Sequence, residues 1–417
     1  MRQDRFGNKL ATSGPAADAY GEGLDLFLGA NFGAVEAFEA ALAEDARFAR
    51  GWSALGRARM MGGDMAGAQA ALAEAQRLGG DPAADIFALL LAGRAPEARR
   101  AAEAHVADAP RDALVAQLCV SVFGLIGFSG CTAREVDQLA YTAALVPHYG
   151  EEWWMMSAHG VSLCETGQLE PALQLIEASL ALNPRNSQAA HFKAHTLYEM
   201  GETGAGRAYL AAWMQGYDRR SLIHGHLRWH EALWALHAGD ADAMWAAVDD
   251  GVTPKASSSL PLNALTDTAA IYHRAELAGH AVDPARWAAL SDYAAARFAN
   301  PGQSFADLHA ALAHAMAGQG ARLARLAEAQ NGFAADLVRP AAAAWGHIAR
   351  QDWAEAEAAL QPVMAHHARL GGSRAQRDLL ELTWANVLLR QGKARQAHRA
   401  LRARPALGPN APLAVLH

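Results

Sequence analysis

The feature that most constrains this chain is a recurrence of small and large apolar residues at intervals of about 34 residues. Gly201 follows Gly167 by 34 positions (201 − 167 = 34), and Ala194 and Leu197 stand just before Gly201. Two antiparallel helices can approach closely where such small residues stand at their contact. A chain that repeats this unit folds into helix pairs that each bury one face against the next pair.

The copy between Trp52 and Ala75 is the clearest, and it matches the tetratricopeptide pattern except that Arg59 occupies an aromatic place. Its matching residues are Trp52, Leu55, Gly56, Gly63, Ala68, Leu72 and Ala75. Other copies centre on Gly160, Gly201, Gly239, Gly318, Ala344 and Ala385. The sequence therefore predicts an all-α, tetratricopeptide-like helix-pair solenoid, a right-handed superhelix with irregular loop insertions.

The repeats predict a single continuous solenoid over residues 17–405. Its N-terminal repeats occupy 17–145 and its site-bearing repeats 146–405, with an N-terminal extension over 1–16 and a C-terminal tail over 406–417. We expect breaks between repeats at Asn300–Gly302, at Leu370–Ser373 and in a loop after Pro254 that includes Asn263. Such loops on a rigid scaffold often carry function.

Composition narrows the class of protein further. Hydrophobic residues make up 52% of the chain, much of it alanine, which favours helices, and the scarcity of β-branched runs argues against an extensive sheet. The net charge of −7 comes without a basic stripe, so we expect no nucleic-acid partner. No P-loop, dinucleotide fingerprint or GxSxG elbow occurs, which disfavours nucleotide-driven and α/β-hydrolase chemistry.

The uncharged stretch from Ala113 to Ala133 is long enough to cross a bilayer, but its Gly, Ser and Gln residues favour a buried helix followed by a Gly-rich turn. No apolar segment follows Met1–Arg5, so no secretory signal is expected. Cys119, Cys131 and Cys164 predict small buried residues of a reducing compartment. We therefore expect a cytoplasmic chain without a membrane partner.

Histidines and carboxylates gather in the second half of the chain. His191, His195 and Glu199 stand four residues apart, which places them in one stripe of a helix, and His226 and His230 form a second such pair. Because Ala194 and Leu197 take the packing positions, this stripe is expected to face the concave groove. The predicted catalytic residues are His191, His195, Glu199, His226, His230, Asp267, Asp307 and His309.

The predicted substrate-binding residues share an aromatic or hydrogen-bonding side chain near that groove. Glycines before Ser373 leave backbone amides that favour an anion at a helix start, or serve only as a helix cap, and Arg377 lies one turn further on. Asp307 and His309 are two positions apart, so on a regular helix they face away from each other. The predicted binding set is Trp154, Tyr198, Trp229, Ser373, Arg374, Gln376 and Arg377.

A metal is the alternative to a metal-free site. The main interpretation includes no cofactor, because the HExxH signature is absent and Phe192 occupies the position of its Glu. A divalent metal such as zinc at His191, His195, His226 and His230 is the competing interpretation. Structural or exposed histidine pairs are the third.

The chain resembles the tetratricopeptide repeat protein 38 family. The resemblance covers about residues 147 to 383 and rests on blocks in order, which are Pro147-His148-Tyr149, Asn183-Pro184-Arg185-Asn186, His191-x3-His195-x3-Glu199, His226–His230, Leu265-Thr266-Asp267, Arg286-Trp287, Phe305–His309 and Gly371–Asp378. Arg374 stands where the family has His, and Ala306 where it more often has Asn. The resemblance implies the fold and the place of a site, and it leaves the reaction open.

Two functions compete. The first is an enzyme that binds a small polar, anionic substrate and uses His–carboxylate acid/base chemistry of hydrolase, lyase or condensation type, with or without a metal. The second is a non-catalytic adaptor that binds a peptide or protein in its groove, which the fold class favours by analogy. Because the polar residues concentrate in a few repeats, we favour the enzyme; the alanine-rich helix faces also suit a homodimer.

Overall fold

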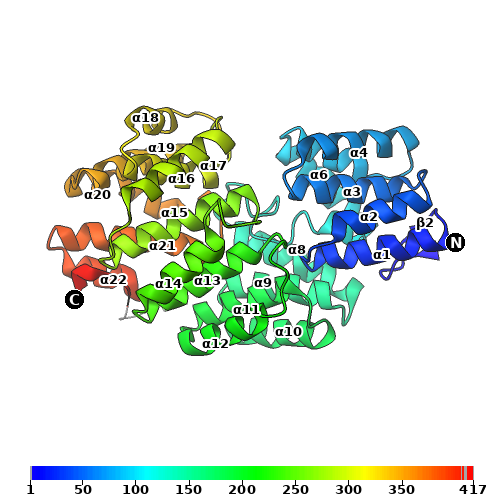
Figure 1. Cartoon of the computed structure of the whole chain (residues 1–417), viewed down its shortest axis with the longest axis horizontal. Helices are drawn as coiled ribbons and strands as arrows, with labels where there is room; N and C mark the ends of the chain where they lie inside the picture. The colour runs from blue at the N-terminus through cyan, green and yellow to red at the C-terminus, as the bar shows by residue number, and fades with distance from the viewer. Residues whose placement is uncertain (1, 405, 408–410, 417) are drawn as a thin grey trace. The chain divides into compact units, whose positions relative to one another are not determined.

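The computed structural model describes residues 2–404, 406–407 and 411–416, and almost all of its regular structure is helical. The only strands in this described part are β1 (Arg2–Gln3) and β2 (Lys9–Leu10), which pair antiparallel with Arg2 opposite Leu10. Helix pairs then follow one another along the chain (Figure 1). The all-α prediction of tetratricopeptide-like helix pairs is confirmed.

Two compact units divide the chain. Unit 1 comprises Met1–Gly127, Glu135–Lys193 and Arg220–Leu222, and unit 2 comprises Phe128–Arg134, Ala194–Arg219 and Ile223–His417. The earlier helices are α1 (Gly14–Leu28), α2 (Ala34–Glu44), α3 (Ala49–Met61), α4 (Met65–Leu78), α5 (Ala83–Leu91), α6 (Ala95–Asp108), α7 (Ala113–Ala116), α8 (Arg134–Tyr149), α9 (Trp153–Glu165), α10 (Leu169–Leu182) and α11 (Ser187–Glu199). The single continuous solenoid over 17–405 stays a prediction.

The later helices, from α12 onward, all belong to unit 2. They are α12 (Thr203–Met214), α13 (His224–His237), α14 (Ala241–Ala247), α15 (Pro261–Leu277), α16 (Pro284–Arg297), α17 (Ser304–Met316), α18 (Gly320–Ala327), α19 (Ala335–Ala349), α20 (Trp353–His366), α21 (Arg374–Arg390) and α22 (Ala394–Arg402). A π-helical turn, η1 (Val248–Val252), extends α14, and the 3-10 turns η2 (His367–Leu370) and η3 (Ala414–Leu416) complete the set.

Small residues close the helix pairs as the repeat pattern predicts. A Cβ at Gly56 in α3 would lie 2.7 Å from Leu72 Cδ2 in α4, and one at Gly160 in α9 would lie 2.6 Å from Ile176 Cγ1 in α10. Real Cβ atoms do not approach so closely, so only glycine lets these helices meet at this distance. The pairs α3–α4 and α9–α10 lie side by side (Figure 1).

The core of unit 1 is apolar. Tyr20 contacts Phe48 edge to face at 5.3 Å and lies 5.8 Å from Phe38. One buried charge, Asp112, has two partners, since it accepts a hydrogen bond from Arg50 and lies 2.8 Å from the Nε2 of His105. Arg50 and His105 hold the pKa of the Asp112 carboxyl down, at about 2, although burial opposes this shift.

The buried helix expected after Ala113 is the single turn α7, and the turns that follow it contain Gly124 and Gly127. Two other details of the sequence analysis are wrong. Asn263 lies inside α15 and outside the loop, since Pro261 starts that helix at its first position. Cys131 is exposed, whereas Cys119 and Cys164 are buried as expected.

The other expected breaks are confirmed. Residues 298–303 separate α16 from α17, and residues 371–373 separate η2 from α21. Within the part of the chain that the structure describes, no helix combines the length and the apolar character needed to cross a membrane.

Candidate histidine and carboxylate site

Two helices of unit 2, α13 and α15, are buried on nearly every face. In α15, 14 of the 17 residues are buried, among them Asp267, His273 and Arg274. In α13 the buried residues include His226, Trp229 and His230. Polar side chains on such helices cannot reach water, so each must be stabilised by another protein group or by a ligand.

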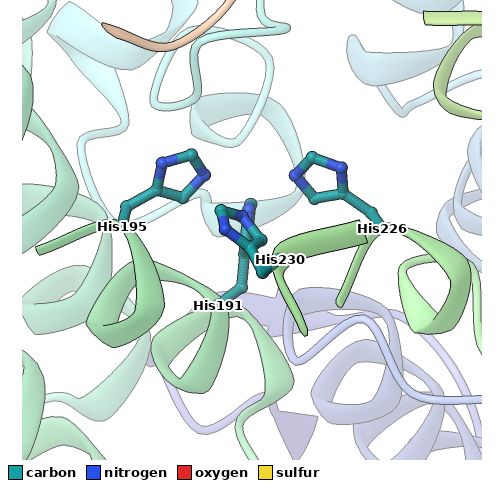
Figure 2. Close-up of side chains that lie close together, drawn as sticks. All are labelled: His191, His195, His226 and His230. Atoms are coloured by element: carbon teal, nitrogen blue, oxygen red, sulfur yellow. The ribbon is translucent and has the colours of Figure 1, made fainter. Parts of the chain in front are cut away.

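Four imidazoles converge at one point. His191 and His195 come from α11 and His226 and His230 from α13, and one ring nitrogen of each lies within 4.8 Å of the others. The His230 ring contacts His195 edge to face at 4.5 Å and His226 at 5.0 Å. Figure 2 shows the rings of His195 and His226 turned toward each other, with His230 between them. Two helix stripes therefore form one cluster, the histidine cluster.

Asp267 orients one member of the cluster. Its Oδ2 lies 2.6 Å from Nδ1 of His226, and both side chains are buried. Because the carboxylate lies against Nδ1, the other ring nitrogen, Nε2, points away from Asp267. Trp229 stacks on the same ring at 5.2 Å and 15°, which fixes its plane. The second oxygen of Asp267 has no hydrogen-bond partner among the described residues.

Burial keeps two imidazoles neutral. It lowers the pKa of His195 to about 3, with a further contribution from the charge of His226. It also lowers the pKa of His309 to about 4, where Asp267 opposes the shift and Arg274 adds to it. At neutral pH both rings therefore offer an uncharged nitrogen, which is the form that accepts a proton or binds a metal.

Asp307 and His309 take separate partners, as their spacing in α17 requires. The Nδ1 of His309 lies 2.7 Å from the carbonyl oxygen of Phe305, and the Oδ2 of Asp307 accepts a hydrogen bond from the Gly302 amide at 2.9 Å. Burial raises the pKa of Asp307 to about 6. Both side chains thus bond to backbone, and His309 is coupled electrostatically to Asp267 of α15.

Glu199 belongs to a second cluster. Arg404, which the sequence analysis missed, holds the Glu199 carboxylate through Nη1 and Nη2 at 2.8 Å each and also donates to Asp378 at 2.6 Å and 2.8 Å. The Tyr198 hydroxyl donates to Asp378 at 3.1 Å, and burial raises its pKa. Arg374 lies 3.4 Å from Glu199. The predicted stripe from His191 to Glu199 therefore serves two clusters.

The glycine-rich segment before α21 forms a helix cap. Ser373 Oγ accepts a hydrogen bond from the Gln376 amide at 3.2 Å, and Gln376 Oε1 accepts one from the Ser373 amide at 3.0 Å. Arg377 donates to the Gly372 carbonyl at 2.8 Å. Gly371 and Gly372 have φ of 90° and 76°, which only glycine adopts without strain. These contacts are those of a helix cap, which was one of the two expectations for this segment. A binding role for the segment stays a prediction.

Trp154 lies in the apolar core of unit 1. Its ring contacts Tyr149 at 5.5 Å and Phe6 at 6.2 Å. Trp229, in contrast, lies against the histidine cluster through His226 and His230. Of the two tryptophans predicted to bind substrate, Trp229 is the one placed beside the imidazoles.

Arg274 is the second residue that the sequence analysis missed. It is fully buried in α15, its Nη2 donates to the Ala375 carbonyl at 2.6 Å, and its guanidinium lies 6.0 Å from the Trp229 ring. Its Nε and Nη1 have no hydrogen-bond partner among the described residues. A buried cation with free donors beside a polar cluster attracts an anion. No motif in the sequence marked Arg274, because α15 carries other polar residues such as Asp267 and His273.

One cavity of unit 2, of about 530 Å³, lies elsewhere. Tyr272, Arg286 and Tyr293 line it together with Asp249 and Lys255. Arg286 forms a two-point ion pair with Asp249 there, at 2.5 Å and 2.9 Å. None of the predicted site residues lines this cavity.

Comparisons with known proteins add little to this geometry. No family model matches the chain. A solved structure of Naa15/Naa10 bound to HypK-THB matches with 13% identity and a TM-score of 0.23, covering 93% of this chain and 68% of that one. The P58(IPK) TPR domain matches with 12% identity and a TM-score of 0.21, covering 93% and 98%. TM-scores this low support no argument, so the fold assignment rests on the helix pairs of this chain.

Proposed function

We propose that the histidine cluster and Asp267 form the site of an enzyme that binds a small polar, anionic molecule and acts on it by His–carboxylate acid/base chemistry. The observation that carries the proposal is the 2.6 Å contact between Asp267 and Nδ1 of His226. A carboxylate behind an imidazole fixes its tautomer and stabilises its protonated form, which is the arrangement of a general base. Hydrolysis, elimination and condensation at a carbonyl or imine all need such a base.

Arg274 supplies the complement for an anionic substrate. Its buried guanidinium lies near Trp229, which in turn stacks on His226. Donors without protein partners can be satisfied by a carboxylate or phosphate group, with a charge-assisted hydrogen bond at each nitrogen. Arg274 therefore takes the anion-binding role that the sequence suggested for Arg377.

The resemblance to the tetratricopeptide repeat protein 38 family, a cytoplasmic location and one continuous solenoid over residues 17–405 belong to the same proposal. The support for the family is the order of its blocks, of which His191-x3-His195, His226–His230 and Leu265-Thr266-Asp267 meet at the histidine cluster and Asp267.

A thermal-shift screen tests this function. Small carboxylates, phosphate monoesters and amino acids would be added to the chelator-treated full chain, and to Arg274→Gln and His226→Gln variants. We expect anionic compounds to raise the melting temperature of the wild type and to lose this effect in both variants. The control is His314→Gln, because His314 is a buried imidazole that bonds to Ser291 outside the cluster. Equal shifts in all four proteins would contradict the proposal.

The adaptor remains the second candidate, and the helix-pair fold favours it. An adaptor would bind a protein partner through its exposed helix faces, so Arg274→Gln would leave partner binding unchanged. Co-purification of a single defined partner that binds the wild type and Arg274→Gln equally, with no small-molecule shift in the screen, would favour the adaptor over the enzyme.

A further inference from the structure

We infer that the histidine cluster is the binding site of one divalent transition-metal ion, and that Zn²⁺ is the ion whose preferences it fits. The inference deepens the proposed function and rests on it only for the use of the site. His195, His226 and His230 are the central ligands, and His191, one turn earlier on α11, completes the set.

The distances suit such an ion. Zn–N bonds are about 2.0–2.1 Å long, so the ligand atoms of a tetrahedral site lie roughly 3.4 Å apart. The four imidazole nitrogens lie within 4.8 Å of one another, so modest side-chain rotations bring them to that spacing. Figure 2 shows the His195 and His226 rings facing each other, with the His191 and His230 rings overlapping between them in this view.

The two helices supply the ligands in a regular way. Each contributes histidines four residues apart, which places both rings on one face of its helix. Two such pairs on two helices can make a four-nitrogen site. The HExxH signature describes a different arrangement, in which one helix supplies two histidines and the third ligand comes from elsewhere. The absence of that signature therefore does not count against a metal here.

Asp267 provides an independent argument. Histidines that bind a metal commonly donate their other N–H to a carboxylate, which fixes the ring and makes the ligand nitrogen more basic. The Asp267–His226 contact has this form, because the carboxylate lies 2.6 Å from Nδ1 and the ligand nitrogen would then be Nε2. Trp229 stacks on the ring and holds its plane. The Asp267 contact at Nδ1 and the Trp229 ring on its face together fix the orientation of the His226 ring, with Nε2 as the ligand atom.

The donor atoms select the kind of ion. All four are imidazole nitrogens, which suit Zn²⁺, Cu²⁺, Ni²⁺ and Fe²⁺ and do not suit Mg²⁺ or Ca²⁺. All four side chains are also buried, so the ion would be shielded from water on most sides. A three-nitrogen site keeps a position open for substrate or water, whereas four nitrogens close the site.

The test is metal binding by the untagged full chain. Metal would be removed with a chelator, and ZnCl₂ would then be titrated by calorimetry, with the metal content of dialysed protein measured by mass spectrometry. We expect one Zn²⁺ per chain in the wild type, none in the His195→Ala/His230→Ala double variant, and one in His314→Ala, the matched control with its buried imidazole outside the cluster. Binding by the double variant at wild-type affinity would overturn the inference.

Two further variants separate the roles of the residues. Asp267→Asn is expected to keep the stoichiometry and to weaken Zn²⁺ binding about 10- to 100-fold, as loss of a carboxylate behind a ligand histidine does. The His191→Ala variant should still bind one ion if His195, His226 and His230 are the three ligands. Loss of binding in this variant would show that all four imidazoles hold the ion. A Co²⁺ spectrum of the wild type reports tetrahedral nitrogen coordination without any substitution, so a variant that fails to fold does not decide the matter.

The outcomes distinguish the metal from the proposed function. Absence of both Zn²⁺ binding and a tetrahedral Co²⁺ spectrum in the wild type overturns the metal site, while the thermal shift by anions in chelator-treated protein tests the acid/base site separately. Stoichiometric Zn²⁺ binding without any anion-dependent shift supports the metal and contradicts the proposed small-molecule function.

Discussion

Helices α4 and α15 both contain several alanines and leucines, yet they are buried in different ways. In α4 the buried residues Ala68, Ala71, Leu72 and Ala75 form one stripe, and the other faces are exposed. In α15 nearly every residue is buried, including Asp267 and Arg274. Helix α4 thus buries one apolar stripe, as an amphipathic helix does. Helix α15 also buries the charged side chains of Asp267 and Arg274, which apolar packing does not require.

The position of the buried charges in each unit indicates which one is the better candidate for function. In unit 1, Arg50 contacts both Asp112 and Asp81, although Asp81 Oδ2 and Arg57 Nε have no hydrogen-bond partner among the described residues. In unit 2, Asp267 Oδ1 and two donors of Arg274 also have no hydrogen-bond partner among the described residues, and both side chains lie on the helix whose Asp267 contacts the histidine cluster. Proteins retain such costly groups where they serve a ligand or a reaction. Substitutions in both units test whether the two regions differ in this way.

The largest effect is expected from Arg404→Met in unit 2. The substitution leaves the carboxylates of Glu199 and Asp378 buried without their cation, and breaking a buried ion pair in this way costs about 3–5 kcal/mol. Amide hydrogen exchange in α21 and α22 would measure the loss. The control is Arg374→Met, which removes a longer 3.4 Å contact from a more exposed side chain. Equal effects would mean that Arg404 is not the main partner.

Leu72→Ala in unit 1 is expected to cost about 2–5 kcal/mol, because it leaves a cavity under the glycine contact of α3 and α4. Hydrogen exchange in these two helices measures the effect. An apolar core responds to volume alone, so Leu72→Met should recover most of the stability. If Leu72→Met were as damaging as Leu72→Ala, packing would not explain the stripe in α4.

A pH dependence of about 2 kcal/mol is expected from Asp307. Its pKa of about 6 in the folded protein lies above the ordinary aspartate value of 3.8, because burial disfavours the charged form, so the folded state binds the proton more tightly. The resulting stabilisation is complete below about pH 4 and is lost as the pH rises through 6. His195 and His309 act in the opposite sense, because their lowered pKa values make stability fall as the pH falls below 6.5 toward 4.

Subtracting the profile of Asp307→Asn isolates the carboxyl contribution from that of the histidines. The free energy of unfolding would be measured in urea between pH 4 and 8. The wild type should lose stability relative to the variant across pH 4 to 6. A constant difference between the two proteins would show that Asp307 has an ordinary pKa.

The smallest effect is expected at the Arg77–Glu74 ion pair on the surface of α4. Both groups are solvated, and exposed pairs contribute little. Arg77→Ala should therefore melt within error of the wild type. A clear loss of stability would show that the exposed face of α4 is not the inert surface assumed in the comparison.

Much of the fold followed from local pattern. Gly56 and Gly160 stand where the repeat requires a small residue, and that requirement is set within one helix pair. Four-residue spacing places His191 with His195, and His226 with His230, each pair on one face of its own helix, whereas the approach of the two pairs depends on how α11 and α13 pack. The role of these residues stays a prediction.

Other features depend on contacts that no local pattern contains. Glu199 shares the periodicity of His195, but its partner Arg404 is 205 residues away, and nothing near either residue indicates the pairing. Arg274 became notable only through the burial of α15 on all sides. The cap at Ser373 was available from sequence, since a Ser followed three residues later by Gln is the capping-box signature.

The pairing of Glu199 with Arg404 also has a consequence for synthesis of the protein. Glu199 leaves the ribosome long before Arg404, so during most of translation its carboxylate has no access to this cation. The end of α11 therefore reaches its final contacts only when the segment after α22 has emerged. Since His191 and His195 lie on the same helix, we expect the histidine cluster to be among the last parts of the newly made chain to become rigid.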